Sequence, residues 1–293
     1  MGDKVVNINE KLISVLQKRE NIIGAAILPN NERFPFHANE YDYFLLIVSS
    51  NQEVKDEISH LEIDGQRIFI RTIYSELIDQ STASVSHYNL IDWLVSGEII
   101  YDRENLLQAI KQKVIKFPEN YRDYRKLKEF SGFVETLYLT KKNLHENNVL
   151  DAYSQIISAV HYWAHIVLID EGIHPELTVW QQIRKVHPGV YKLYEELLAS
   201  PESIEQRVRL VMLACEFTIM NKMKECCKYL LDTMAKTDHA WSITDFKQHP
   251  ELRYISDDLT LVLRKLVQGH YLKEVIEVVN LETNILEIKY DIA

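Results

Sequence analysis

The stretch IIGAAILPNNERFPFHANEYDYFLLIV, residues 22–48, sets the expected fold of the N-terminal part of the chain. A short apolar segment leads into a polar loop at 29–40, and six consecutive apolar residues follow at 43–48. The pattern predicts strands at 22–28 and 41–50. The second strand has no polar face, which is typical of a strand in a sheet covered on both sides.

Two carboxylates, Glu40 and Asp42, stand at the start of the second predicted strand. Residues i and i+2 of a strand point to the same face, so the two are expected to project together. Mg²⁺ prefers hard oxygen ligands, usually one or two carboxylates with phosphate oxygens and water. The pair therefore predicts a site for a magnesium-bound nucleoside triphosphate. The simpler interpretation is two solvated acids ahead of a core strand.

The sequence on either side predicts a small α/β sheet. The periodicity of residues 7–20 indicates an amphipathic helix, 51–62 a short polar helix, and 67–73 an alternating strand after an Asp-Gly turn. Residues 84–117 indicate a helix, a short strand at 98–102 and another helix, before a proline ends this part of the chain.

The rest of the chain has a different pattern. Long helical periodicities with short connections predict an antiparallel helical bundle. The expected helices are 121–146, 150–171, 176–199 and 202–234. Two short helices and a β-hairpin follow, which is the order of a winged helix. The fold class is therefore mixed α+β: a small α/β sheet domain at 1–118, a helical bundle at 119–235 and a winged-helix-like module at 236–293.

Composition limits the possible functions. The chain has 293 residues and a formal net charge of −10, which argues against a protein that coats nucleic acid or an anionic membrane. No apolar run approaches the ~20 residues that a membrane-spanning helix needs. The first 20 residues carry no signal-peptide core, so we expect a cytoplasmic protein. The three cysteines, Cys215, Cys226 and Cys227, are expected to be reduced thiols.

At residues 22–48 the sequence resembles the polymerase-beta-type nucleotidyltransferase superfamily, which includes the aminoglycoside nucleotidyltransferases. Their pattern is an apolar residue, Gly-Gly or Gly-Ser, a loop, and acid–apolar–acid entering a strand. Gly24 takes the first glycine position, Ala25 stands at the second, and Glu40 and Asp42 take the positions of the two acids. The resemblance implies transfer of a nucleoside monophosphate from a magnesium-bound nucleoside triphosphate to an unknown acceptor, which the bundle helps to bind.

The whole layout looks like a bacterial family described as nucleotidyltransferase-like, but three positions and the loop length depart from the superfamily pattern. The loop is longer than usual, and the first acid is Glu40 rather than the more common aspartate. Ala25 lacks the hydroxyl of a serine that would contact phosphate. Arg71 stands in the strand where the superfamily usually carries a third carboxylate, the base for the attacking hydroxyl. Arg71 would either pair with Glu40 or Asp42, or bind phosphate in a bidentate way. The alternative function is therefore a catalytically inactive homologue that binds nucleotide or protein.

Two further patterns have competing interpretations. His161 and His165 lie four residues apart on one predicted helix face, where they would be bundle-core side chains, line an acceptor pocket or, least favoured, bind zinc. The run at 111–128 carries seven basic residues and two tyrosines. Such a run is usually a solvated helix face, and less often a groove for phosphate or RNA.

The predicted recognition helix of the winged module, 257–267, begins with two acids, Asp257 and Asp258, and carries only Arg264 and Lys265 as bases. Helices that read DNA place basic or amide side chains near their N-terminus. We therefore expect this module to be a structural cap or to contact a protein partner, including a second copy of the chain, rather than nucleic acid.

Overall fold

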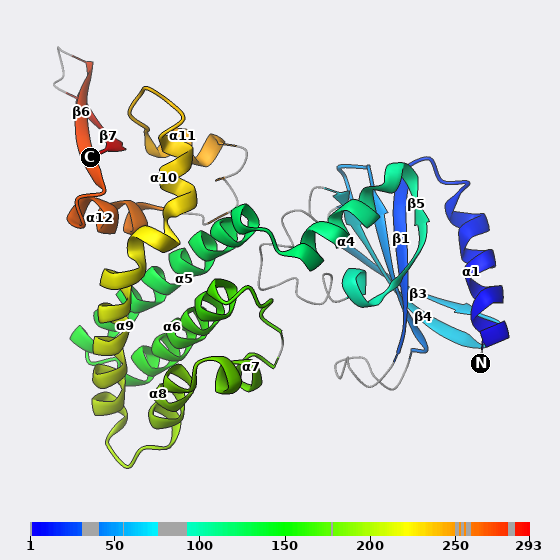
Figure 1. The fold of residues 1–293 in the computed structure, drawn as a ribbon, viewed down its shortest axis with the longest axis horizontal. Helices are drawn as coiled ribbons and strands as arrows, with labels where there is room; N and C mark the ends of the chain where they lie inside the picture. The colour runs from blue at the N-terminus through cyan, green and yellow to red at the C-terminus, as the bar shows by residue number, and fades with distance from the viewer. Residues whose placement is uncertain are drawn as a thin grey trace. The chain divides into compact units, whose positions relative to one another are not determined.

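The computed structural model describes residues 2–30, 41–54, 56–75, 93–176, 178–249, 252, 255, 259–280 and 285–293. The chain forms two compact units, Met1–Phe117 and Pro118–Ala293 (Figure 1). No helix in the described ranges is long and apolar enough to cross a membrane.

The first unit is built on a five-stranded sheet with the order β3-β4-β2-β1-β5. Strands β2 and β4 are parallel, and the other neighbouring strands are antiparallel. The strands are β1 (Ile22–Pro29), β2 (Tyr43–Ser49), β3 (Asp56–Ile63), β4 (Gln66–Tyr74) and β5 (Glu98–Asp102). The predicted strands at 22–28, 41–50, 67–73 and 98–102 are thus present.

Both faces of this sheet are covered, as the apolar strand at 43–48 indicated. Helix α1 (Gly2–Leu16) buries Ile8, Leu12 and Leu16 against one face. Helix α4 (Leu106–Lys116) covers the opposite face, where Leu107 joins a separate apolar cluster (Figure 1). The burial of every residue of β2 follows from this three-layer arrangement.

The predicted polar helix at 51–62 is wrong, because residues 56–63 form strand β3. Asp64 and Gly65 have positive φ values of 52° and 75°, as a tight two-residue hairpin turn requires. This turn places β3 antiparallel to β4 along its whole length. β3 is an edge strand whose side chains are mostly exposed. Its polar residues therefore gave a sequence pattern that is also typical of an exposed helix.

The second unit begins with the helical bundle. Its helices are α5 (Glu119–His145), α6 (Val149–Asp170), α7 (Val179–Val186), α8 (Pro188–Ala199), α9 (Ile204–Cys226) and α10 (Lys228–Met234). The single helices expected at 176–199 and 202–234 are each two helices. The first break lies at His187, directly before Pro188. A proline ring clashes with the preceding turn of a helix, so α7 ends here and Pro188 begins α8. The second break lies at Cys227.

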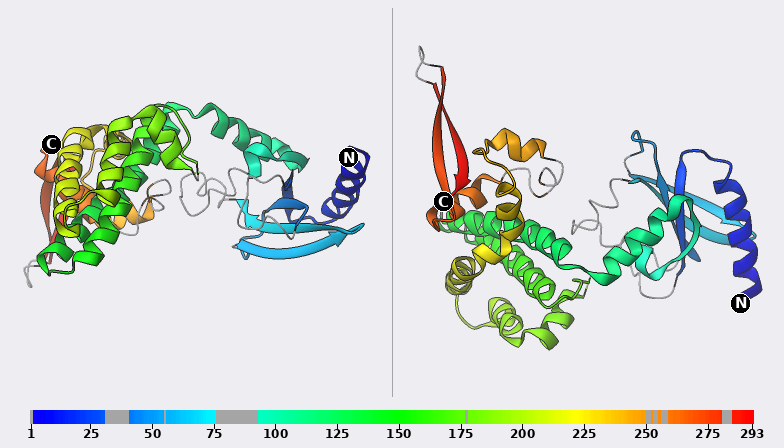
Figure 2. Two further views of the ribbon diagram at one scale, coloured as in Figure 1. Left: turned by 90° about the horizontal axis from the view of Figure 1, so that it is seen from below. Right: turned by 45° about the horizontal axis from the view of Figure 1, so that its top comes forward.

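The C-terminal module consists of α11 (Ile243–Gln248), α12 (Thr260–Gln268), β6 (Leu272–Asn280) and β7 (Ile285–Ile292). The capping box that the sequence indicated between Ser242 and Asp245 is present at the start of α11. Trp241 forms an isolated antiparallel bridge with Tyr290 of β7, next to the β6–β7 hairpin. Helix, helix and hairpin are therefore present, and the hairpin projects from the module (Figure 2).

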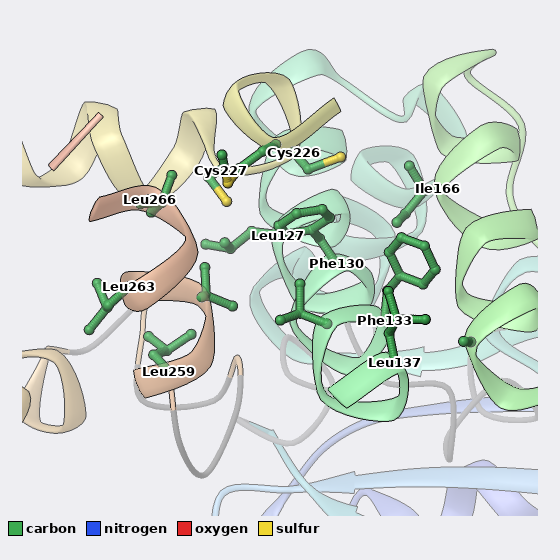
Figure 3. Packing of buried hydrophobic residues seen from close by; sticks show 14 of the residues in the cluster. Leu127, Phe130, Phe133, Leu137, Ile166, Cys226, Cys227, Leu259, Leu263 and Leu266 are labelled. Atoms are coloured by element: carbon green, nitrogen blue, oxygen red, sulfur yellow. The ribbon is translucent and has the colours of Figure 1, made fainter. Parts of the chain in front are cut away.

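The bundle and the C-terminal module share one hydrophobic core. Phe130 and Phe133 of α5 belong to the same buried cluster as Leu259, next to the start of α12, and Leu263 of α12 (Figure 3). The predicted domains 119–235 and 236–293 thus lie in a single compact unit, whereas the division after Phe117 falls at the predicted end of the sheet domain.

Candidate functional site

Asp42 lies directly before the central strand β2, at the end of the sheet where the parallel strands β2 and β4 begin. Its amide donates to the Arg67 carbonyl at 2.8 Å, and its carbonyl accepts from the Asn30 amide at 2.8 Å. Its Oδ2 accepts a hydrogen bond from the Arg67 amide, also at 2.8 Å. Within the described residues Oδ1 has no partner, and the side chain is exposed. The carboxylate is therefore fixed in place with one oxygen directed away from the backbone contacts.

Glu40, the other predicted metal ligand, lies outside the described residues. Its pairing with Asp42 stays a prediction. The described residues contain no group of three or more His, Cys, Asp or Glu side chains arranged to hold a metal ion.

The structure does not bring Gly24 to the acidic end of the sheet. Gly24 lies within β1, opposite Val48 of β2, whereas Asn30 is the residue opposite Asp42. Asn30 is six positions further along the chain than Gly24, which is about 20 Å in an antiparallel strand. A Cβ atom on Gly24 would lie 2.6 Å from the Leu107 side chain, so this glycine permits the close packing of α4 on β1.

Ala25 is fully buried in the cluster beneath α1, on the face opposite the one that Gly24 occupies. Two residues at the end of this strand lie near Asp42: Pro29, the last residue of β1, and Asn30, which follows it. Asn30 also donates from Nδ2 to the Tyr41 carbonyl at 2.8 Å. Gly24 and Ala25 therefore lie away from Asp42 along the strand, and their role in nucleotide binding stays a prediction. The start of the polar loop at residue 29 was the signal for the end of β1 that lies near Asp42.

Arg71 lies in β4, paired with Leu46 of β2 and Ile58 of β3. By strand alternation Arg71 and Asp42 share one face of the sheet. The register places Arg67 beside Asp42, and Arg71 is four residues further along, about 13 Å away in strand length. Arg67, which the sequence motif did not single out, is therefore the closer cation.

A second group of ionisable side chains lies inside the bundle, between α5 and α6. We call Arg125, Glu129 and His165 the buried trio; their side chains are each about 1% exposed. His165 Nδ1 lies 2.9 Å from Glu129 Oε2, and Arg125 Nη2 lies 3.9 Å from Glu129 Oε1. Burial alone would raise the pKa of Glu129, but His165 and Arg125 hold it below its ordinary value. Glu129 is therefore a buried carboxylate that its neighbours keep ionised.

His161 connects the buried trio to less buried aromatic side chains. Its ring centroid is 4.5 Å from that of His165 and 5.9 Å from that of Trp180, which stacks on Tyr194 at 3.7 Å. Burial, followed by the neighbouring His165, lowers the pKa of His161 to about 4. His161 is therefore neutral at pH 7 and can accept a hydrogen bond from a bound hydroxyl group.

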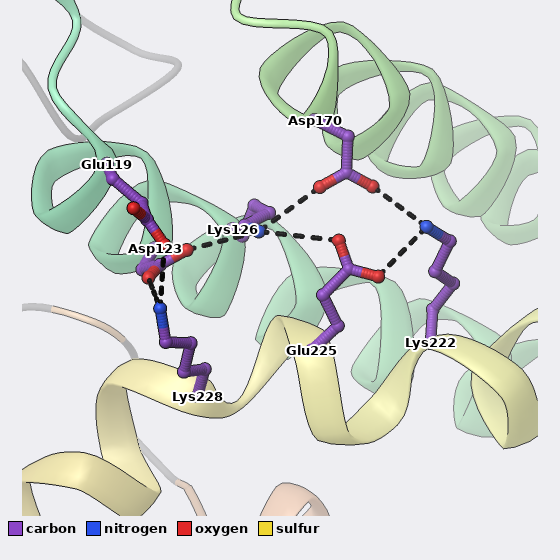
Figure 4. A network of polar contacts seen from close by, with 7 residues as sticks. All are labelled: Glu119, Asp123, Lys126, Asp170, Lys222, Glu225 and Lys228. Carbon is purple, nitrogen blue, oxygen red and sulfur yellow. Dashed lines mark hydrogen bonds and ion pairs between the residues drawn. The ribbon is translucent and has the colours of Figure 1, made fainter.

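A further group of charges lies where α5 meets α6, α9 and α10 (Figure 4). Lys126 is its centre, with Nζ 3.1 Å from Asp123, 3.2 Å from Asp170 and 3.6 Å from Glu225. The full set, here called the Lys126 network, is Glu119, Asp123, Lys126, Asp170, Lys222, Glu225 and Lys228. Opposite charges alternate within the network, and its ion pairs link α5, α6, α9 and α10. These pairs account for the charged side chains, so no bound ligand is needed to explain them.

Comparison with known proteins gives matches to three family models, one after another along the chain. Residues 6–122 match a family model described as nucleotidyltransferase-like, residues 123–222 one described as a YgxA-like substrate binding domain, and residues 228–292 one described as a helix-turn-helix domain. Asp42 lies in the first match, and the buried trio lies in the second.

The protein YgxA of Bacillus subtilis (strain 168), described as uncharacterized, is 29% identical over 263 residues, covering 90% of this chain and 88% of YgxA. The crystal structure of a nucleotidyltransferase-like protein from Exiguobacterium sibiricum 255-15 has the same fold. The TM-score is 0.85 at 22% identity, and the match covers 97% of this chain and 98% of the other. The chain therefore has a nucleotidyltransferase-like fold, with a nucleotidyltransferase-like domain before the region that matches the YgxA-like model and a helix-turn-helix domain after it.

Proposed function

We propose that this protein transfers a nucleoside monophosphate from a magnesium-bound nucleoside triphosphate to the hydroxyl group of an acceptor molecule. The observation that carries the proposal is the position of Asp42 at the start of the central strand β2, where the Arg67 amide holds Oδ2 and the residue is exposed. The match of residues 6–122 to a nucleotidyltransferase-like family supports the same reading.

Glu40 and Asp42 would hold the magnesium ion, which supplies positive charge to offset that of the triphosphate. Asp42 fits this role because it offers a hard oxygen ligand on a carboxylate that is already oriented. Arg67 and Arg71 share the face of Asp42 by strand alternation, and guanidinium groups bind phosphate oxygens in a bidentate way. The chain thus offers both the acids and the cations that a bound triphosphate requires.

In the proposed reaction the acceptor hydroxyl loses its proton to water and its oxygen bonds to the α-phosphorus, while the bond to the bridging oxygen of the β-phosphate breaks and pyrophosphate leaves. The helical bundle would bind the acceptor, in agreement with the description of its family model as a substrate binding domain. His161 is the side chain that we assign to the acceptor, because it is neutral at pH 7 and is only partly buried.

A second function is favoured by one specific observation, the arginine at position 71. The superfamily pattern has a carboxylate on the corresponding strand, and no group of three acidic or metal-binding side chains exists among the described residues. In this alternative the protein binds the nucleotide as a sensor or scaffold and transfers nothing. Both functions require binding of the triphosphate, and only the first releases pyrophosphate.

Calorimetric titration of ATP, GTP, CTP and UTP with Mg²⁺ tests the shared step. We expect one nucleotide to bind the wild type and its binding to be lost in Asp42→Asn. Asp102→Asn is the matched control, because Asp102 accepts from the Leu107 and Gln108 amides at the start of α4, and asparagine also caps helices well. Binding that Asp42→Asn leaves unchanged, or no binding at all, would contradict both functions.

Pyrophosphate release in the presence of candidate hydroxyl acceptors then separates the two functions. Transfer predicts release that depends on the acceptor and is absent in Asp42→Asn. The alternative predicts tight binding of the triphosphate, and no release with any acceptor.

A further inference from the structure

A groove in the second unit lies between α5, α9 and α12 and belongs to neither site described above. Its volume is about 430 Å³, which is within the range of small-molecule sites. It is formed where α12 of the C-terminal module packs beside α5 of the bundle, near Leu137 (Figure 3). All of its walls are in the same compact unit.

The floor of the groove is apolar. Leu137 of α5 is buried in the shared core, and Leu261 of α12 is partly buried against that core. Tyr138 adds an aromatic ring that remains 50% exposed. These side chains provide a surface that an apolar group of a ligand can cover, with a gain proportional to the area removed from water.

The rim of the groove is positively charged. Lys141, Arg264 and Lys265 line it, and Glu216 is the only carboxylate among its lining residues. Glu216 forms an ion pair with Lys141. Arg264 and Lys265 form no ion pair with any carboxylate in the described part of the chain. Their two charges are concentrated here although the chain as a whole has a net charge of −10.

We propose that this groove binds an amphipathic anion, a small molecule with an apolar body and a carboxylate or phosphate head. The body would cover Leu137, Tyr138 and Leu261, and the head would lie between Arg264 and Lys265. Charge complementarity determines the choice, since a neutral apolar ligand would give both cations no counter-charge beyond what the described residues offer, and a simple anion would leave the floor exposed to water. The proposed ligand is a single dissolved molecule rather than a lipid in a membrane. A groove between three helices encloses one apolar body more completely than contact with a flat membrane surface would.

This site gives the basic residues of α12 a role other than contact with nucleic acid. A ligand that touches α5 and α12 together would stabilise the C-terminal module against the bundle. The proposal does not depend on nucleotide binding, because none of its residues lies in the first unit.

The test is calorimetric titration of decanoate, below its micelle concentration, into the full-length protein. We expect saturable binding of one molecule per chain. Acetate has the same head without the body, and decanol has the same body without the head, so each should bind at least 10-fold more weakly. Equal binding of decanol or acetate would overturn the proposal, as would binding only to anionic lipid vesicles and not to dissolved decanoate.

Variants separate the two parts of the site. Arg264→Gln combined with Lys265→Gln should weaken decanoate binding at least 10-fold, and Tyr138→Ala should weaken it several-fold. Lys273→Gln on the β6–β7 hairpin, where Lys273 pairs with Asp291 at 3.2 Å, is the control and should bind like the wild type. Thermal unfolding of each variant shows whether the fold is retained. A folded double variant with wild-type affinity would refute the proposal.

Discussion

Arg125 and Lys126 are consecutive residues of α5, yet they belong to two very different groups of charges. Arg125 points into the bundle, where its side chain and those of Glu129 and His165 are about 1% exposed. Lys126 belongs to the Lys126 network, several members of which are 40–70% exposed (Figure 4). The comparison shows that neighbouring positions on one helix can hold a group of charges that reaches water and a group of charges that only the protein surrounds.

The physical difference is desolvation. Charges that leave water lose several kcal/mol each, and their mutual attraction must replace that loss. An exposed pair loses little hydration and gains correspondingly little. The energetic effect of a substitution should therefore depend on the location of the group more than on the number of ion pairs that it makes. The four predictions below test this statement in order of decreasing effect.

The largest effect is expected for Glu129→Ala, which leaves the buried Arg125 guanidinium and the buried His165 ring without the carboxylate that they both contact. We expect the free energy of unfolding to fall by about 3–5 kcal/mol. Urea unfolding followed by tryptophan fluorescence measures it, since three of the four tryptophans, Trp163, Trp180 and Trp241, lie in the second unit.

Replacing the whole buried trio is the control for that experiment. The triple variant Arg125→Met, Glu129→Leu and His165→Leu removes every charge at once, so we expect stability within about 1 kcal/mol of the wild type or above it. A loss below about 1 kcal/mol in Glu129→Ala would show that the carboxylate is not needed to compensate the other two groups.

His161 should make the stability of the second unit depend on pH. Its pKa in the folded protein is about 4 against an ordinary 6.5, so the unfolded chain binds more protons between these values. Stability is therefore fully present above pH 6.5 and is lost as the pH falls towards 4, by up to about 3 kcal/mol. Urea unfolding at intervals from pH 4 to 7.5 should show a smaller slope in His161→Gln. The same slope in both proteins would exclude His161 as its source.

Lys126→Met should have an intermediate effect. Burial alone would lower the pKa of Lys126, but Asp170 and Asp123 raise it above its ordinary value, so the lysine is charged at neutral pH. Its removal leaves carboxylates facing one another and should cost about 2 kcal/mol. Arg209→Met, which breaks an exposed pair with Glu205, is the matched control and should cost below about 0.5 kcal/mol. Similar losses in both urea titrations would remove the distinction between the two positions.

The smallest effect is expected for Lys228→Gln. Lys228 pairs with Glu119 at 2.8 Å and Asp123 at 3.0 Å, so its two contacts are shorter than any of the three that the buried Lys126 makes. It is nevertheless exposed, and we expect no measurable change in the urea midpoint. A clear destabilisation would show that the number of ion pairs, rather than their burial, determines stability here.

The sequence by itself determined the elements that depend on local pattern. The continuous apolar run at 43–48 predicted a strand covered on both faces, and α1 and α4 cover it. The 3.6-residue periodicity predicted α5 and α6, and Ser242 with Asp245 predicted the cap of α11. The order of sheet, bundle and winged-helix-like module was also predictable, because each part has its own period and spacing.

Only the tertiary structure decided which residues meet. Register is set by pairing between distant segments, so the sequence did not show that Gly24 lies about 20 Å from the residue opposite Asp42, or that Arg67 lies beside it. Residues 56–63 became a strand because the Asp64–Gly65 turn places them along β4. The buried trio and the groove beside α12 depend on the faces that packed helices present to each other, which a linear pattern leaves undetermined.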